Sequence, residues 1–207
     1  MFKSIEENVE AEIVEKKSKF IAHIYYVESV EEAENLIKQA NKKYFDARHN
    51  CYAFCINDEG NNPINRFSDD GEPSGTAGAP ILNILTSQNL SNVLVIVTRY
   101  FGGILLGTGG LVKAYSLAVQ EALNKAKIIT KDLGKEVQII VNYADFEKLK
   151  YYLNQNNIKM IDVKYEENIC VNIEITDQKL EKMLQEKESF NFKIIDYSII
   201  KQKFIKI

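Results

Sequence analysis

Glycine and proline are distributed unevenly along this 207-residue chain, and this restricts the folds it can adopt. Eight of the 10 glycines lie between residues 71 and 110, and the 3 prolines, Pro63, Pro73 and Pro80, lie in or beside that window. Because these residues interrupt helices and strands, we expect tight turns inside the window and long regular elements outside it. The chain therefore has one turn-rich segment within an otherwise uninterrupted α/β pattern.

The composition is that of a soluble globular protein, with 45% hydrophobic and 27% charged residues. The longest aliphatic run, residues 93–97, is too short to span a bilayer, and the acidic first residues show no secretory signal. Three cysteines do not make a disulfide framework. We expect a cytoplasmic protein that binds no membrane. The net charge of −3 gives no general attraction to nucleic acid, so RNA binding would require a local basic patch.

The first 130 residues have the pattern of a mixed α/β domain. Ser29 and Glu32 have the spacing of a capping box, and apolar residues follow at helical intervals. Residues 93–100 are apolar on both faces, as in a central strand. The expected elements are strands 9–15 and 19–27, a helix over 30–44, strands 50–56 and 64–68 joined by a turn at Asp58–Asn61, a short helix from Pro80, the central strand, and a long helix from about Gly110.

The chain after about residue 130 has a different pattern of apolar and polar residues. Residues 169–175 alternate between apolar and polar side chains, which predicts a sheet with one wet face. Asp145 and Thr176 are the expected caps of two helices. The order βαββαβ predicts a small ferredoxin-like sandwich. A charge cluster and Gly134 in segment 127–136 suggest a linker, so we expect an α+β protein with domains 1–130 and 135–207.

The glycine-rich segment after the central strand is the first candidate site. It matches neither a P-loop, since Thr108 stands where lysine is required, nor the dinucleotide fingerprint, which needs a third glycine at Val112. Small residues at a helix N-terminus still suit an anion. Tight helix–strand packing is the alternative explanation. The candidate anion-binding residues, for a phosphate above all, are Arg99, Gly102, Gly103, Gly107, Gly109, Gly110 and Lys113.

Two further groups are weaker candidates for chemistry. Asp69, Asp70 and Glu72 place three carboxylates within four residues, but Gly71 and the following proline favour a structural turn. We expect no metal there and no cofactor elsewhere. His49 precedes a buried strand, where it is either a structural histidine or a general base. A catalytic role for these four residues stays open, because the sequence does not show which nucleophile would pair with which base.

Four segments resemble the IMPACT/YigZ family: "KSKFIAHI", "HNCYAFCI", "RFSDDGEPSGTAGAPIL" and "VIVTRYFGGILLGTGGLVKAYSLAV". The resemblance covers most of residues 1–130, and the rest is similar to the small C-terminal domain of bacterial members. It implies an N-terminal α/β sandwich like the second domain of a small-subunit ribosomal protein. It also implies a C-terminal domain like the last domain of elongation factor G. Eukaryotic relatives are implicated in translational control through protein–protein binding.

Two hypotheses for the function follow. The first is a non-enzymatic module associated with RNA, the ribosome or a protein partner in translation, and it requires a basic face with exposed aromatic residues. The second is an enzyme acting on a phosphorylated or carboxylated small molecule, and it requires one pocket that joins the glycine segment to the carboxylate turn. We favour the first. The sequence leaves the oligomeric state open.

Overall fold

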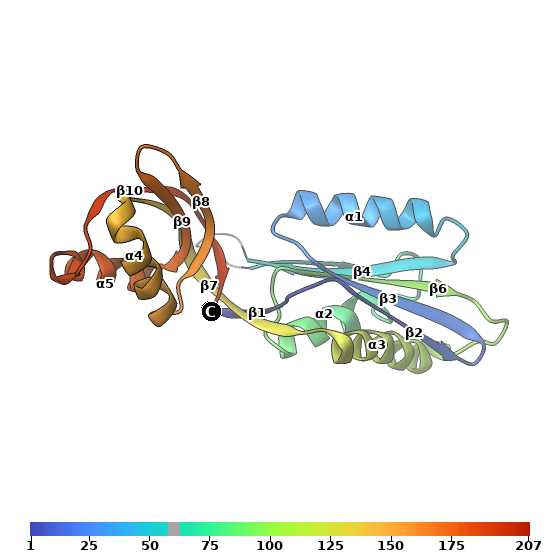
Figure 1. Ribbon diagram of the computed structural model, residues 1–207. Helices are drawn as coiled ribbons and strands as arrows, with labels where there is room; N and C mark the ends of the chain where they lie inside the picture. Colours follow the sequence, from blue (N-terminus) through green and yellow to red (C-terminus); the bar gives the residue numbers. More distant parts are fainter. Residues whose placement is uncertain (58–62) are drawn as a thin grey trace. The chain divides into compact units, whose positions relative to one another are not determined.

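The computed structural model describes residues 1–57 and 63–207, so the turn expected at Asp58–Asn61 lies outside the described residues. The chain is α+β and consists of two compact units. The N-terminal unit comprises residues 2–130, and the C-terminal unit comprises residues 131–207 together with Met1. Each unit is built around its own sheet (Figure 1).

The N-terminal sheet is antiparallel, in the order β2-β3-β6-β4-β5. Helix α1 lies on one face, and α2 and α3 lie on the other (Figure 1). β6 pairs with a strand on each side and residues 93–97 are buried, as the sequence predicted for a central strand. The bounds are β2 (Val9–Glu15), β3 (Ser18–Tyr26), α1 (Val30–Lys43), β4 (His49–Ile56), β5 (Ile64–Ser68), α2 (Gly78–Ser87), β6 (Val93–Tyr100) and α3 (Gly107–Lys125).

The helices form where the sequence supplies caps and apolar faces. The Ser29 side chain accepts a hydrogen bond from the Glu32 backbone N–H at 3.1 Å, which confirms the predicted start of α1. Tyr115 on α3 is fully buried, and its ring meets that of Phe20 on β3 edge to face, with centroids 5.1 Å apart. This contact fixes α3 against the sheet.

Helix α3 begins at Gly107, earlier than the sequence predicted. Gly109 and Gly110 are therefore helical residues, and Lys113 lies in the second turn. The helix dipole therefore acts only weakly on Lys113, because its effect falls off within the first turn. No side chain caps the N-terminus of α3, and its first turn carries no acidic residue. This helix end therefore keeps its positive partial charge.

The C-terminal unit has the predicted order of strands and helices. Its strands run β10-β7-β9-β8, all antiparallel. The sequence analysis missed β1 (Phe2–Ile5), whose residues belong to the N-terminal unit. β9 alternates between buried and half-buried residues, as predicted. The bounds are β7 (Ile128–Val141), α4 (Tyr143–Gln155), β8 (Lys159–Tyr165), β9 (Ile169–Thr176), α5 (Asp177–Glu186), a 3-10 turn (Lys187–Ser189) and β10 (Ile194–Lys206).

Two local expectations for this region were wrong. Asn142, rather than Asp145, caps α4: its side chain accepts a hydrogen bond from the Asp145 N–H at 2.9 Å. The segment expected as a linker lies largely within β7, which runs without a break from residue 128 to residue 141. Its residues pair with β10, a long-range contact that local composition does not reveal. Thr176 does cap α5, as predicted.

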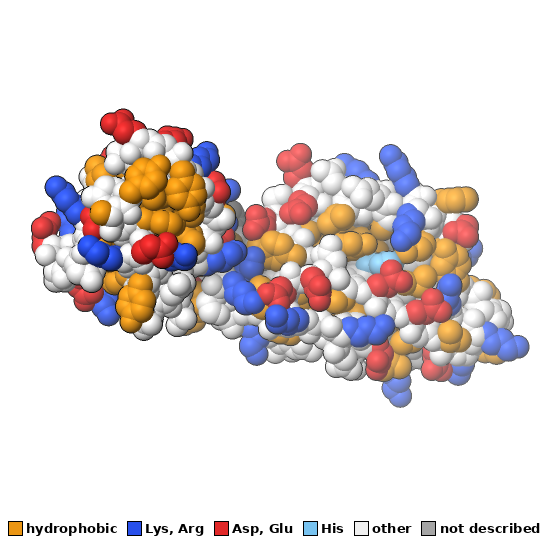
Figure 2. Space-filling model, viewed as in Figure 1, with side chains coloured by type: hydrophobic (Ala, Val, Ile, Leu, Met, Phe, Trp, Pro, Cys, Tyr) orange, Lys and Arg blue, Asp and Glu red, His pale blue; other side chains and the backbone are white. Residues whose placement is uncertain are grey.

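Surface charge is mixed in sign. Figure 2 shows lysine, arginine and acidic side chains interspersed on the visible face of the N-terminal unit, with hydrophobic side chains between them. On the visible face of the C-terminal unit, hydrophobic side chains gather into a patch (Figure 2). Among the described residues, no helix is long and apolar enough to cross a membrane.

Candidate functional site

A cavity of about 490 Å³ opens in the N-terminal unit where the carboxylate turn meets the start of α3. It joins the glycine segment to the carboxylate turn, and this meets the requirement stated for the enzyme hypothesis. Its walls are mostly apolar, and its polar side chains come from β4 and the residue before it, from β6, from the turn and from the start of α3. The lining residues on which the site depends are Arg48, His49, Glu72, Arg99, Phe101 and Gly107.

Glu72 is the centre of a buried hydrogen-bond network in this cavity. Its side chain is 3% exposed. Arg99 Nη1 donates to Glu72 Oε1 at 2.6 Å, and the Tyr115 hydroxyl donates to the same oxygen at 2.9 Å. Because a buried carboxylate is stable only when it is paired and hydrogen-bonded, these two donors are what allow Glu72 to lie there.

Arg99 is a buried part of the same network. Its guanidinium carbon lies 5.4 Å from the Phe20 ring centroid and 5.6 Å from that of Phe101. Its Nη2 is 3.5 Å from the Ser18 hydroxyl, while its Nε has no hydrogen-bond acceptor among the described residues. Arg99 is therefore a buried arginine and not a solvated surface charge.

His49 faces Glu72 in a fixed orientation. Its Nδ1 lies 2.6 Å from the carbonyl oxygen of Asp70, so in neutral His49 the proton is on Nδ1 and Nε2 is an acceptor. Nε2 is 3.8 Å from Glu72 Oε2, which is too far for a hydrogen bond. Both atoms therefore keep capacity for a partner.

The nearby thiol and phenol are not prepared for nucleophilic chemistry. The Cys51 thiol donates to the Asp69 carbonyl at 2.9 Å and lies 3.3 Å from the Tyr115 hydroxyl. Burial raises the pKa of Cys51 to about 12, and burial likewise raises the pKa of Tyr115 far above its ordinary value. Since the thiolate is the nucleophile, Cys51 is unreactive near neutral pH.

The two aspartates of the turn are used in its construction. Asp69 accepts backbone hydrogen bonds from Gly75, Ala77 and Gly78, and Asp70 Oδ2 accepts one from Asn50 at 2.6 Å. The three carboxylates thus have separate partners. Within residues 1–57 and 63–207, no group of three or more His, Cys, Asp and Glu side chains is placed to hold a metal ion.

The structure divides the predicted anion-binding residues. Arg99 and Gly107 line the cavity with Glu72 and His49, whereas Gly109, Gly110 and Lys113 line a second cavity with Glu15 and Lys16. Gly102 packs against the β2–β3 hairpin, where a Cβ would overlap the Lys17 backbone. Gly103 and Gly107 have positive φ values of 84° and 71°.

Sequence reasoning missed three participants. Tyr115, Arg48 and Phe101 were not singled out as site residues. Arg48 directly precedes His49, and Phe101 directly precedes the first glycine of the loop. Their positions beside two candidate motifs were the available signal. The contact between Tyr115 and Glu72 joins residues 43 positions apart, for which the sequence gives no sign.

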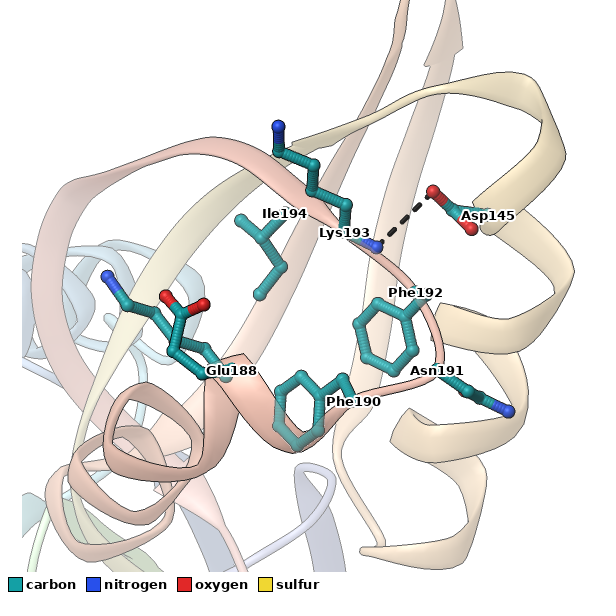
Figure 3. A pocket seen from close by; sticks show the side chains of 8 residues that line it. Asp145, Glu188, Phe190, Asn191, Phe192, Lys193 and Ile194 are labelled. Atoms are coloured by element: carbon teal, nitrogen blue, oxygen red, sulfur yellow. Dashed lines mark hydrogen bonds between the residues drawn. The ribbon is translucent and has the colours of Figure 1, made fainter.

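A cavity of similar size, about 500 Å³, lies in the C-terminal unit (Figure 3). Phe190 and Phe192 stack there with centroids 4.8 Å apart. The Asp145 carboxylate accepts from the Lys193 backbone N–H at 3.3 Å and pairs with Lys148 at 3.1 Å. In Figure 3 the polar ends of Asn191 and Lys193 point outward. None of the site residues predicted from the sequence lines this cavity, so it is the weaker candidate.

Comparison with known proteins gives concordant matches. Residues 16–123 match the model of the Impact N-terminal domain. The IMPACT family member YvyE of Bacillus subtilis is 36% identical over 91% of this chain and 82% of its own length. YigZ of Escherichia coli is 33% identical over 88% of this chain and 86% of its own length. A crystal structure described as that of a hypothetical protein is 29% identical, with a TM-score of 0.64, covering 100% of this chain and 97% of the other.

Proposed function

Because the chain belongs to the IMPACT family, we propose that it is a non-enzymatic module that associates with RNA or the ribosome and takes part in translation regulation. The proposal extends to a protein partner in translation. The fold supports it by analogy: we regard the N-terminal unit as similar to the second domain of a small-subunit ribosomal protein. The βαββαβ unit is likewise similar to the last domain of elongation factor G.

The observation that carries the proposal is a basic surface around the start of α3, formed by Lys16, Lys17, Arg48 and Lys113. All four side chains are exposed, and none makes an ion pair within the described part of the chain. They adjoin residues 102–110: the Lys17 backbone packs on Gly102, Arg48 lines the first cavity, and Lys16 and Lys113 line the second.

The surroundings of this basic surface suit a phosphate backbone. Glu15 is the acidic side chain that lines the second cavity, and in the first cavity Glu72 is neutralised by Arg99. The uncapped α3 N-terminus adds positive partial charge. Phe101 and Leu105 are exposed beside it and offer the apolar surface on which unpaired bases stack. Local charge thus supplies what the net charge of −3 does not.

Binding of a fluorescently labelled single-stranded RNA over a salt series tests the proposal. We expect micromolar or weaker affinity that falls as salt rises. Lys113→Ala and Arg48→Ala should each weaken binding about fivefold, the equivalent of ~1 kcal/mol for one exposed charge contact. Each should also reduce the slope of the logarithm of the binding constant against the logarithm of the salt concentration, by about 0.7 for every phosphate that the variant no longer neutralises.

Lys38→Ala is the matched control, because Lys38 is also exposed but lies on α1, across the sheet from α3. It should bind RNA like the wild type. The proposal is wrong if the wild type does not bind RNA, or if Lys38→Ala weakens binding as much as Lys113→Ala does.

A further inference from the structure

The cavity at the centre of the candidate site has apolar walls and a polar floor. Phe101 is 48% exposed, and Leu105 and Pro73 line the walls with it. Glu72 and His49 supply the polar groups of the floor. Its volume of about 490 Å³ lies in the range of sites that hold small organic groups. Apolar walls with a few polar atoms match a flat ring whose edge carries hydrogen-bonding groups.

The floor presents two acceptors with unused capacity. Glu72 Oε1 accepts hydrogen bonds from both Arg99 and Tyr115, while Oε2 is 3.8 Å from His49 Nε2. With Nδ1–H donating to the Asp70 carbonyl, neutral His49 also offers a lone pair at Nε2. An amino group carries two N–H donors, so one –NH₂ group can satisfy both acceptors at once.

The mouth of the cavity is suited to a phosphate. Gly107 and Thr108 are the first residues of α3 and line the cavity, so backbone N–H groups that the helix leaves unpaired lie at its edge. Arg48 is exposed on the same cavity. The buried Arg99, whose Nε lacks an acceptor among the described residues, is a second polar group here with incomplete hydrogen bonding.

From this arrangement we propose that the cavity receives one unstacked base of single-stranded RNA. The base stacks on Phe101, its exocyclic amino group donates to Glu72 Oε2 and His49 Nε2, and its phosphate lies at the α3 N-terminus beside Arg48. This inference rests on the proposed RNA-binding function and adds a preference. Cytosine, adenine and guanine carry an exocyclic amino group, and uracil presents carbonyl oxygens instead. Uracil has a single ring N–H donor, at N3 between two carbonyl groups, so it can satisfy at most one of the two acceptors of the floor.

The sharpest test compares oligocytidine with oligouridine of the same length, at one pH near neutrality and one salt concentration. The two backbones carry the same charge, and both bases are pyrimidines. We expect oligocytidine to bind roughly tenfold more tightly, because leaving a buried charged acceptor unpaired is costly. Free cytidine monophosphate, which lacks the neighbouring phosphates, should bind far more weakly than the oligonucleotide.

A pair of matched variants tests the stacking. Phe101 and Phe67 are both 48% exposed, but Phe67 lies on the edge strand β5 and does not line the cavity. Phe101→Ala should weaken oligocytidine binding by at least about fivefold, as expected for the loss of one stacked base. Phe67→Ala should leave it within twofold. Because Phe101 also contacts Arg99, thermal melts must show that both variants are folded.

The outcomes separate this inference from the function on which it rests. Equal binding of oligocytidine and oligouridine, with the salt dependence and the basic-surface variants behaving as expected, would overturn base insertion and leave RNA association standing. Absence of binding by either oligonucleotide would overturn both. Cytidine monophosphate binding as tightly as oligocytidine would show that the cavity takes a free nucleotide, and the assignment to RNA would then be wrong.

Discussion

Asp69 shows how one residue of the carboxylate turn acts on structure. Its carboxylate accepts from the backbone N–H groups of Gly75 at 2.9 Å, Ala77 at 3.0 Å and Gly78 at 2.8 Å. Helix α2 starts at Gly78, and Ala77 at its N-cap position has no side-chain acceptor. Asp69 therefore does the work of a helix cap from eight residues away in the sequence.

The charge of Asp69 should matter for stability in a pH-dependent way. Burial alone would raise its pKa, but the three N–H donors outweigh burial and hold the pKa below the ordinary value of 3.8. The stabilisation is therefore complete above that value and is lost as pH falls through the folded-state pKa. We expect Asp69→Ala to lower the free energy of unfolding by about 1–2 kcal/mol at pH 7.

Urea unfolding of wild type and Asp69→Ala at several pH values between neutrality and acid provides the measurement. The difference between the two proteins should shrink below the ordinary pKa of the carboxyl. Asp69→Asn, which keeps an oxygen acceptor without the charge, should lose less stability than Asp69→Ala. A difference that stays constant into the acid range would show that ionisation of Asp69 contributes nothing.

The sequence predicted the contacts between residues that are close in the chain, but not the contacts between residues that are far apart. The sequence predicted a turn at Asp69–Glu72 because Asp, Gly and Pro favour turns through local backbone geometry and local hydrogen bonds. The pairing of Glu72 with Arg99 and Tyr115 spans 27 and 43 positions, and it follows only from the register of β6 and the packing of α3. His49 was named, but its partner was not, for the same reason.

At the scale of elements, the glycine loop after β6 combines two kinds of glycine. Gly102 is held against the backbone of the β2–β3 hairpin and donates its N–H to the Ser18 hydroxyl at 3.1 Å. Gly109 lies within α3, and a Cβ there would meet nothing within 4 Å. The backbone at Gly102 therefore approaches another part of this protein, whereas Gly109 leaves open space beside the helix.

This contrast predicts opposite effects of the same substitution. Gly102→Ala should lower the free energy of unfolding by at least about 1–3 kcal/mol, because the new methyl group must displace hairpin backbone. Gly109→Ala should raise it by about 0.4–1 kcal/mol, since alanine restricts the unfolded chain and favours the helix. Denaturant melts of the two variants beside the wild type test both signs. Destabilisation by Gly109→Ala would mean that a neighbouring group occupies the space beside it.

Element boundaries were predictable where a cap or a breaker marks them. Ser29 and Thr176 placed two helix starts correctly, because a hydroxyl before an apolar repeat has a direct physical role. The start of α3 was misplaced because glycine is a poor helix former, and sequence preference alone would end the loop later. Packing of Leu111 and Tyr115 into the core outweighs that preference.

At the scale of the whole molecule, the two units have separate cores. One set of buried residues joins the β2–β6 sheet to α2 and α3, and a second fills the space under α1. The C-terminal core, built from β7, β9, α4 and α5, shares no residue with either. The shift in sequence pattern near residue 130 correctly predicted that the chain forms two units. It did not reveal that a continuous strand passes through that position, because strand pairing is long-range.

Independent folding of the two units is the prediction at this scale. Fragments 1–130 and 131–207 should each unfold in a single cooperative transition, because each retains a complete hydrophobic core. A fragment that starts at residue 135 should be less stable than one that starts at residue 131. Residues 131–134 pair with residues 203–206 of β10, and removing them leaves the end of β10 unpaired. Circular dichroism during urea unfolding of the three fragments measures these differences in stability and cooperativity.

A broad, non-cooperative transition in fragment 131–207 or fragment 1–130 would show that folding requires the whole chain. Equal stability of the fragments starting at 131 and 135 would show that these β7–β10 pairs contribute no stability.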